Sequence, residues 1–323
     1  MNSLTRRTFL ATAAAATANL ATPIRALSQA MSPFKLSVIN DEISDDFDHA
    51  CSVASKDFGL EWIELRSLWK INIADLKSDD IARAQAILAK YSLRVTDIAS
   101  PLFKVDWPGA PLSKFSSQKG AKNDSFAATA DFKKQDEVLA ACIDLAKQFK
   151  TGKIRCFDFW RLDDPTPHRA AIDQKLRAAA ETCNKQGITL VIENEHECNT
   201  ATAPEAARTL AAVAPLMLNW YPANAVMAGE TDAFPAGWAK LPKDRIRHVH
   251  CKNAIRSDAG KIEWSPVDKG FIDWPAQFTA LKSIGYSNAV SLETHWRGAG
   301  TPEASSRISW AGMKQALKAS GTL

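Results

Sequence analysis

The sequence predicts a single (β/α)8 barrel, the TIM-barrel architecture, over residues 31–323. Eight short apolar segments rich in β-branched residues alternate with longer amphipathic segments, and no composition break or internal repeat divides the chain. Strands that alternate with helices form parallel sheets, and eight such units in about 290 residues match one barrel of this kind. A doubly wound open sheet is the competing architecture, but no GxGxxG turn follows the first segment.

The predicted strands are short apolar runs bounded by turn residues. In chain order they cover residues 35–39, 62–65, 94–99, 153–157, 189–193, 216–220, 247–250 and 289–293. The predicted helices between them include residues 81–90, 134–149, 170–186, 204–212, 275–284 and 302–319. Several of these helices open with proline, which suits the first helical turn because no N–H has to be paired there.

Residues 100–131 form a long segment after the third predicted strand that mixes Pro, Gly, Ser, Lys and aromatic residues. In a barrel such a segment is a βα loop on the catalytic face. A loop of this length either covers a site or is merely mobile, and the sequence leaves both interpretations open.

Residues 1–30 are typical of a twin-arginine signal peptide. They contain no acidic side chain, and Arg6-Arg7 precede an alanine-rich apolar stretch with small residues near Ala26 and Ala30. The stretch from residue 9 to 21 is too short to cross a hydrocarbon core of about 30 Å. We therefore expect export to the periplasm or the medium, with the twin-arginine translocase as a partner during export and no stable membrane insertion.

The charge balance argues against nucleic acid as a partner. The chain has 40 Lys and Arg against 36 Asp and Glu, and removal of the three arginines of the leader leaves 37 against 36. A nearly neutral protein has no basic field to attract a phosphate backbone.

A disulfide framework is not expected. The six cysteines are Cys51, Cys142, Cys156, Cys183, Cys198 and Cys251, and no CxxC pair or His/Cys cluster at zinc-ligand spacing occurs. Substrates of the twin-arginine pathway fold in the reducing cytoplasm, so we interpret most of these cysteines as small buried apolar residues.

Functional side chains of such barrels lie at the carboxyl ends of the strands, where polar residues are dense in this sequence. The candidates are Glu64, Asp158, Trp160, Glu193, His196, Asn224, His248, His250, Lys252, Glu293, His295 and Trp296. Two carboxylates and an imidazole from the fifth, seventh and eighth strands would form a site for Mn²⁺, Mg²⁺, Co²⁺ or Zn²⁺. Such an ion polarises a carbonyl, while flanking glutamates remove and return the proton on the neighbouring carbon. This chemistry is that of sugar isomerisation.

His248 and His250 lie two residues apart on the seventh predicted strand. We expect them to point to opposite faces, so that only one of them reaches an ion and the other is structural. The roles of His196 and His295, at the ends of the fifth and eighth strands, stay open.

The order of several motifs resembles the xylose isomerase-like barrel superfamily of sugar phosphate isomerases and epimerases. These motifs are IENE with Glu193, NWYPANA, HVHCKN with His250, WSPVDKGFIDW, and SLETHW with Glu293, and the similarity covers roughly residues 36–317. The resemblance implies that Glu193, His250 and Glu293 hold a divalent metal and that the two glutamates also act as acid and base. Lys252, in the superfamily's H-x-K pattern, is then a substrate contact.

One ligand position departs from the superfamily pattern. Where its members usually read N-W-D-P-x-N, this chain has Tyr221 in place of the aspartate ligand, and a neutral phenol is a poor ligand. Water, Asn224 or Asp158 could replace the aspartate, or three ligands could bind the ion more weakly. A metal-free or altered reaction stays open. The superfamily's Gly-x-Gly after the seventh strand also reads Asp268-Lys269-Gly270 here.

The chain contains ten tryptophans, several in or beside predicted βα loops. These are Trp69, Trp107, Trp160, Trp264, Trp274 and Trp296. Aromatic faces stack on sugar rings, although core packing accounts for at least half of them. We expect Glu64, Trp160, Asn224, Lys252 and Trp296 to bind substrate.

The sequence therefore predicts an exported sugar isomerase, epimerase or keto-sugar lyase with a carbohydrate substrate. An apurinic-site endonuclease uses the same barrel with three zinc ions, but it needs more His and Asp ligands than these strand ends offer. A non-catalytic sugar-binding or accessory barrel that has lost its metal site is the second alternative, because fold alone does not decide function.

Overall fold

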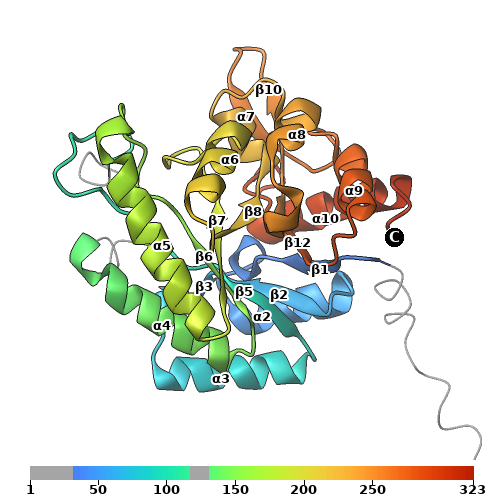
Figure 1. Cartoon of the computed structure of the whole chain (residues 1–323). Helices are drawn as coiled ribbons and strands as arrows, with labels where there is room; N and C mark the ends of the chain where they lie inside the picture. Colours follow the sequence, from blue (N-terminus) through green and yellow to red (C-terminus); the bar gives the residue numbers. More distant parts are fainter. Residues whose placement is uncertain (1–31, 117–130) are drawn as a thin grey trace, which may run out of the picture.

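The computed structural model describes residues 32–116 and 131–323, and its centre is a sheet of eight parallel strands surrounded by helices (Figure 1). The strands follow the order β1-β12-β9-β8-β7-β6-β5-β2. A parallel bridge between Ile39 and Glu64 joins the ends of β1 and β2, so that the sheet closes into a nearly complete barrel. The predicted (β/α)8 architecture is confirmed. The predicted leader, residues 1–30, lies outside the described residues.

Each barrel strand coincides with a predicted one, and the bounds differ by at most one residue at either end. The barrel strands are β1 (Lys35–Val38), β2 (Trp62–Leu65), β5 (Arg94–Ile98), β6 (Lys153–Cys156), β7 (Thr189–Glu193), β8 (Met217–Trp220), β9 (Ile246–Cys251) and β12 (Ala289–Leu292). Local side-chain patterns predict these strands well because every one of them is a short, buried, apolar run.

Helices follow every barrel strand. They are α2 (Phe47–Ser52), α3 (Ser78–Lys90), α4 (Gln135–Gln148), α5 (Arg169–Lys185), α6 (Ala203–Ala212), α7 (Pro222–Met227), α8 (Trp238–Lys240), α9 (Trp274–Ser283) and α10 (Pro302–Ala319). The side chains of Thr202, Asp273 and Thr301 accept backbone N–H bonds at the starts of α6, α9 and α10, which satisfies otherwise unpaired donors. Helix α3 starts three residues earlier than predicted because its first turn is polar and shows no apolar period.

Two antiparallel hairpins extend the loops beyond the barrel ends and were not among the predicted strands. One pairs β3 (Ser67–Leu68) with β4 (Ile71–Asn72), and the other pairs β10 (Asn253–Arg256) with β11 (Ile262–Ser265). The second hairpin follows β9 directly and projects at the top of Figure 1. Both are too short to produce a clear alternation in the sequence.

The hairpin after β9 is anchored by the side chain of Asn253. Its amide donates to the carbonyls of Val267 and Ile272 at 2.6 and 3.1 Å, and its oxygen accepts from the Ile272 N–H at 2.9 Å. A Cβ atom on Gly270 would lie 2.1 Å from this oxygen, so glycine is required there. The loop thus keeps the one glycine that its packing needs, although the Gly-x-Gly pattern is incomplete.

The described part of the long segment after β5 lies against the end of β6. The N–H groups of Phe157, Phe159 and Trp160 donate to the carbonyls of Leu102, Phe103 and Val105 at 2.9, 2.9 and 3.0 Å. Residues 117–130 of this segment lie outside the described residues.

Side chains on β9 alternate between the barrel interior and the helix layer. On β9, Val249 and Cys251 belong to the main apolar core, while His248 and His250 face inward. The expectation that the two histidines point to opposite faces is wrong, because residues two apart on a strand share a face. This alternation gives the carboxyl end of the barrel a polar, buried lining.

All six cysteines are buried and unpaired, as expected for small apolar residues of the core. None of the helices in the described ranges is long and apolar enough to cross a membrane.

Candidate functional site

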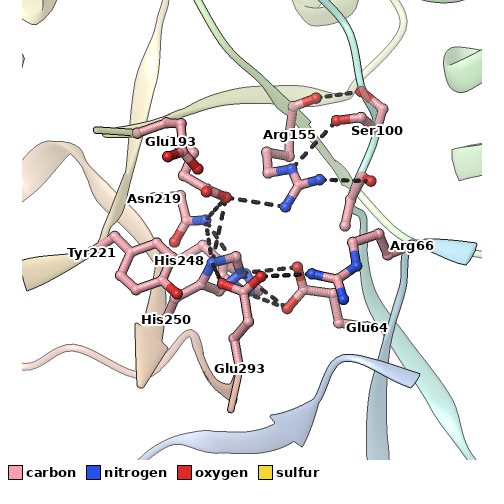
Figure 2. Close-up of polar contacts among 12 residues, drawn as sticks. Glu64, Arg66, Ser100, Arg155, Glu193, Asn219, Tyr221, His248, His250 and Glu293 are labelled. Atoms are coloured by element: carbon pink, nitrogen blue, oxygen red, sulfur yellow. Dashed lines mark hydrogen bonds and ion pairs between the residues drawn. The ribbon is translucent and has the colours of Figure 1, made fainter. Parts of the chain in front are cut away.

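Three side chains predicted to act together, from β7, β9 and the end of β12, meet at the carboxyl end of the barrel (Figure 2). The Nδ1 atom of His250 lies 3.4 Å from Glu193 Oε2 and 3.3 Å from Glu293 Oε2. All three residues are at most 2% exposed. The two carboxylates therefore flank one imidazole nitrogen in a site that is largely closed to solvent.

Glu64, at the end of β2, lies on the other side of the same imidazole. Its carboxylate is 2.9 Å from His250 Nε2 and 3.1 Å from His248 Nε2, and Glu64 is fully buried. We predicted Glu64 as a substrate contact, but its oxygens are bonded to the two histidines. It occupies the position of a carboxylate that orients a ligand histidine.

His248 continues this chain of contacts deeper into the barrel. Its Nδ1 atom lies 3.5 Å from the Asp97 carboxylate, and both residues are fully buried. The sequence left the role of His248 open, and in the structure it connects Glu64 to Asp97 rather than facing the two catalytic candidates Glu193 and Glu293.

Two arginines that we did not predict, one buried and one partly buried, bind the two carboxylates of the centre. Arg155 Nη1 donates to Glu193 at 3.1 Å and Arg155 Nη2 to the carbonyl of Ala99 at 3.0 Å. Arg66 Nη1 donates to Glu293 at 2.6 Å. Their places in the sequence could have indicated this role. Arg155 lies at an inward-facing position of β6, and Arg66 lies two residues after the inward-facing Glu64.

Asn219, on β8, completes the wall beside Glu193. Its amide nitrogen lies 3.3 Å from both Glu193 Oε2 and His250 Nδ1, and its oxygen is buried without a partner among the described residues. The residue was visible in the NWYPANA motif but was not predicted as part of the site.

Tyr221 follows β8 and packs against His250. The two rings are perpendicular with centroids 5.1 Å apart, and Figure 2 shows the tyrosine directed toward His250. The hydroxyl is buried and has no hydrogen-bond partner among the described residues. A buried hydroxyl without a partner is costly, and a bound group that accepts or donates a hydrogen bond there would explain it.

Lys252 closes the site on the side of the β10–β11 hairpin. Its ammonium group lies 3.9 Å from the centroid of the Trp264 ring, 4.5 Å from that of Tyr221 and 3.9 Å from Glu293, and it contacts His295 Nδ1. Lys252 is buried. His295 also lies 3.2 Å from Glu293, which places it at the rim of the same centre.

The surroundings of Glu193 and Glu293 shift the pKa values of the two carboxyls in opposite directions. Burial raises the pKa of Glu193 above its ordinary value, although Arg155 and His250 oppose the rise. Burial also raises the pKa of Glu293, but Lys252 and His295 outweigh it and hold that pKa well below the usual range. Two carboxyls with divergent pKa values are an arrangement typical of an acid and a base.

Other predicted residues lie away from this centre. Asp158 is fully buried, with its carboxylate 2.9 Å from Arg169 Nη1, 2.8 Å from the N–H of Thr200 and 2.6 Å from the Thr200 hydroxyl. It is committed to this network. The Asn224 amide donates to the Asn194 carbonyl at 3.2 Å. Neither residue takes the place of the missing aspartate.

Trp160, His196 and Trp296 lie on the segments that follow β6, β7 and β12. Trp160 packs with Phe157 and Cys198 in a small separate apolar cluster. His196 lies 2.6 Å from Glu195 and 6.3 Å, between ring centroids, from Trp264. Trp296 is half-buried and follows directly after His295.

The donor atoms fit a divalent cation. One atom each from Glu193, His250 and Glu293 lie within 4.8 Å of one another. Tyr221, whose buried hydroxyl has no partner among the described residues, packs against His250. Carboxylate and imidazole donors suit Mn²⁺, Co²⁺ or Zn²⁺, and carboxylates also suit Mg²⁺. A second group of donors, from Glu64, His248 and His250, shares the imidazole.

Comparison with known proteins places the chain in structural context. The model of the xylose isomerase-like TIM barrel family matches residues 53–316. No curated protein sequence matches the chain significantly.

Solved structures with low sequence identity share the fold. A probable 3-DHS dehydratase from Bacillus anthracis is 21% identical, with 87% of this chain and 98% of that chain covered and a TM-score of 0.64. A xylose isomerase-like TIM barrel protein from Mycobacterium smegmatis in complex with magnesium is 16% identical, with coverage of 90% and 98% and a TM-score of 0.62. The 3-keto-D-glucoside 4-epimerase of E. coli is 16% identical, with coverage of 87% and 99% and a TM-score of 0.60.

The network around Asp158 gives a prediction for stability. Asp158→Asn removes the buried partner of Arg169 and should lower the free energy of unfolding by about 3 kcal/mol, measured by urea denaturation followed by tryptophan fluorescence. Asp136→Asn, which breaks an exposed pair with Lys175, should change it by less than about 1 kcal/mol. Loss of metal affinity in folded Asp158→Asn would contradict a purely structural role for Asp158.

Proposed function

The chain belongs to the xylose isomerase-like TIM barrel family, and on this premise we propose that it is a sugar isomerase, epimerase or related keto-sugar lyase. The observation that carries the proposal is the pair of carboxylates, Glu193 and Glu293, that flank His250 Nδ1 at 3.4 and 3.3 Å. Two carboxyls around one buried point can remove a proton beside a carbonyl and return it from another direction.

In the proposed reaction Glu193 and Glu293 are the acid/base pair that removes and returns the proton. Lys252 and His295 hold the pKa of Glu293 well below its usual range. Burial raises the pKa of Glu193, and Arg155 fixes its orientation. A divalent ion held by Glu193, His250 and Glu293 would polarise the carbonyl of the substrate. The buried position of the pair excludes bulk water from the reacting carbon.

The relatives support carbohydrate as the substrate class. One solved structure is a 3-keto-D-glucoside 4-epimerase, and another is D-allulose 3-epimerase in complex with D-allulose. The indole of Trp264 and the half-buried Trp296 at the rim provide apolar faces of the kind that stack on sugar rings. The magnesium complex of a further relative supports a divalent ion.

Exchange of solvent deuterium into keto sugars tests the proposal. The native protein should exchange the hydrogen beside the carbonyl of at least one free or glycosidic keto sugar, detected by mass spectrometry. Glu193→Gln and Glu293→Gln should each lower the rate by about 10²–10⁴-fold, because each removes one proton-transfer group.

Glu181→Gln is the matched control for this experiment. Glu181 is exposed on α5, so the same loss of a carboxylate there should leave exchange unchanged. Sugar binding without any exchange would contradict the enzymatic proposal and favour a non-catalytic sugar-binding barrel.

Metal content provides a second prediction. Elemental analysis of the purified protein should find close to one equivalent of Mn, Co, Mg or Zn, and Glu193→Gln should lose it. Glu64→Gln should weaken binding by about 10–100-fold, because Glu64 orients His250. A native protein without metal, together with metal gained by Tyr221→Asp, would show that the missing aspartate has abolished the ion site.

We also propose that residues 1–30 direct export through the twin-arginine pathway to the periplasm or the medium. Support comes from Arg6-Arg7 and the alanine-rich stretch that follows them. Replacement of both arginines by lysine should retain the protein in the cytoplasm, as judged by cell fractionation, whereas Arg25→Lys should not. Unchanged export of the double variant would contradict the proposal.

A further inference from the structure

A cavity at the amino end of the barrel lies opposite to the candidate catalytic centre. It has a volume of about 530 Å³ and lies between the last turns of α3 and α4 and the starts of β2 and β5, near the bottom of Figure 1. This volume is within the range of small-molecule sites. We call it the α3–α4 cavity. Because the catalytic candidates lie at the carboxyl ends of the strands, the proposed proton transfer does not use it.

Most of the lining of the α3–α4 cavity is apolar. The apolar residues that line it are Trp62, Leu88, Ala89, Leu93, Val95 and Phe149. Two glutamines complete the uncharged part of the lining, and the Gln85 amide donates to the Gln148 carbonyl at 2.9 Å, which joins the two helices. Such a lining suits the hydrocarbon part of a ligand.

The two charged residues of the lining, Arg94 and Lys150, are both basic. Arg94 lies over the Trp62 ring at 4.0 Å, and its Nη2 atom is 2.5 Å from Glu61 Oε2, so a carboxylate already balances its charge. Lys150 is exposed and has no carboxylate within ion-pair distance among the described residues. The cavity therefore has one basic group at its edge that is available to an anion.

Lys150 also has a strained backbone. It is the second residue after the end of α4, and its φ of 55° is left-handed, a conformation that favours glycine at this position of a helix end. Four other helices have a left-handed glycine at the same position: Gly187 after α5, Gly229 after α7, Gly285 after α9 and Gly321 after α10. The two helices that form the cavity have Ser92 and Lys150 instead. A strained residue that keeps a charged side chain suggests a use for that charge.

We propose that the α3–α4 cavity binds a small amphiphile with one hydrocarbon chain and one anionic group, such as a medium-chain carboxylate. The hydrocarbon chain lies against the apolar lining, and the anionic group lies beside Lys150. The ligand is the free molecule rather than a lipid in a bilayer, because anionic bilayers attract clusters of several basic residues and this lining has a single unpaired one. The assignment is independent of the proposed sugar chemistry.

Isothermal titration calorimetry of the full chain with hexanoate, octanoate and decanoate, each below its micelle concentration, tests the hydrocarbon part. Each added CH₂ group should raise the affinity about fourfold, because a further apolar group is buried. Octan-1-ol and octylammonium test the anionic group. Octanoate should bind about fivefold more tightly than octan-1-ol, as expected for an ion pair at the surface, and octylammonium should bind more weakly than either.

Lys150→Gly tests the role of the basic group. It should remove the advantage of octanoate over octan-1-ol and keep the dependence on chain length. It should also shift the midpoint of urea denaturation upward, because glycine adopts the left-handed conformation without strain. Ser92→Gly is the matched control, since it makes the same change after α3 at a residue outside the lining. It should shift the midpoint upward and leave the ratio of the two affinities unchanged.

Ala89→Trp tests the position of the hydrocarbon chain. Ala89 is exposed and lines the cavity, so an indole there should fill the space and lower the affinity for decanoate about tenfold or more. Ala86→Trp, at an exposed position of the same helix outside the lining, is the control and should leave the affinity unchanged.

Several results would overturn the assignment. These are equal affinities for octanoate, octan-1-ol and octylammonium, an advantage of octanoate that Lys150→Gly retains, and decanoate binding that Ala89→Trp does not weaken. Binding to phosphatidylglycerol vesicles without binding of monomeric decanoate would indicate a membrane surface instead of a small-molecule site. None of these measurements uses a sugar, so failure of the cavity assignment and failure of deuterium exchange are separate results.

Discussion

The imidazole of His250 lies among three buried carboxylates, and the balance of their charges organises the carboxyl end of the barrel. Glu64 binds one ring nitrogen, and Glu193 and Glu293 face the other. Burial of unpaired charges is strongly unfavourable. Two arginines balance these charges. Arg155 reaches Glu193 from the neighbouring strand β6, and Arg66, at the end of β2, reaches Glu293 at the end of β12, as Figure 2 shows.

Further ion pairs and hydrogen bonds at the rim of the barrel connect strands that are far apart in the sequence. Arg66 also binds Glu42 at 2.8 Å, and Glu42 in turn lies 2.9 Å from Arg297 and accepts the N–H of His295 at 3.0 Å. These contacts connect the ends of β1, β2 and β12, where the barrel closes. His295 has a positive φ of 45°, a conformation that costs energy for a residue other than glycine and that these contacts hold in place.

Tyr221 is the position at which this chain differs from the superfamily pattern, and its contacts show how the difference changes the charge and the packing of the centre. A phenol in place of an aspartate removes one negative charge from the centre and brings an aromatic face against His250 and Lys252. The donor atoms of Glu193, His250 and Glu293 still lie close together. The substitution therefore removes one donor but leaves the other three in place. The rim beyond Lys252 is aromatic and continues through Trp264 to His196, which links the buried centre to the more exposed part of the surface.

The sequence by itself determined the barrel, its eight strands and the convergence of Glu193, His250 and Glu293, because apolar periodicity is local and strand ends meet at one face of this fold. It did not reveal that Glu64 binds His250, that Arg155 and Arg66 compensate the glutamates, or that Asp158 belongs to a separate network. These contacts join residues that are far apart in the sequence. Which side chains meet depends on how the strands are arranged around the barrel. Only the closed tertiary structure decides this, since the cost of buried charge is settled by contacts in space rather than by spacing in sequence.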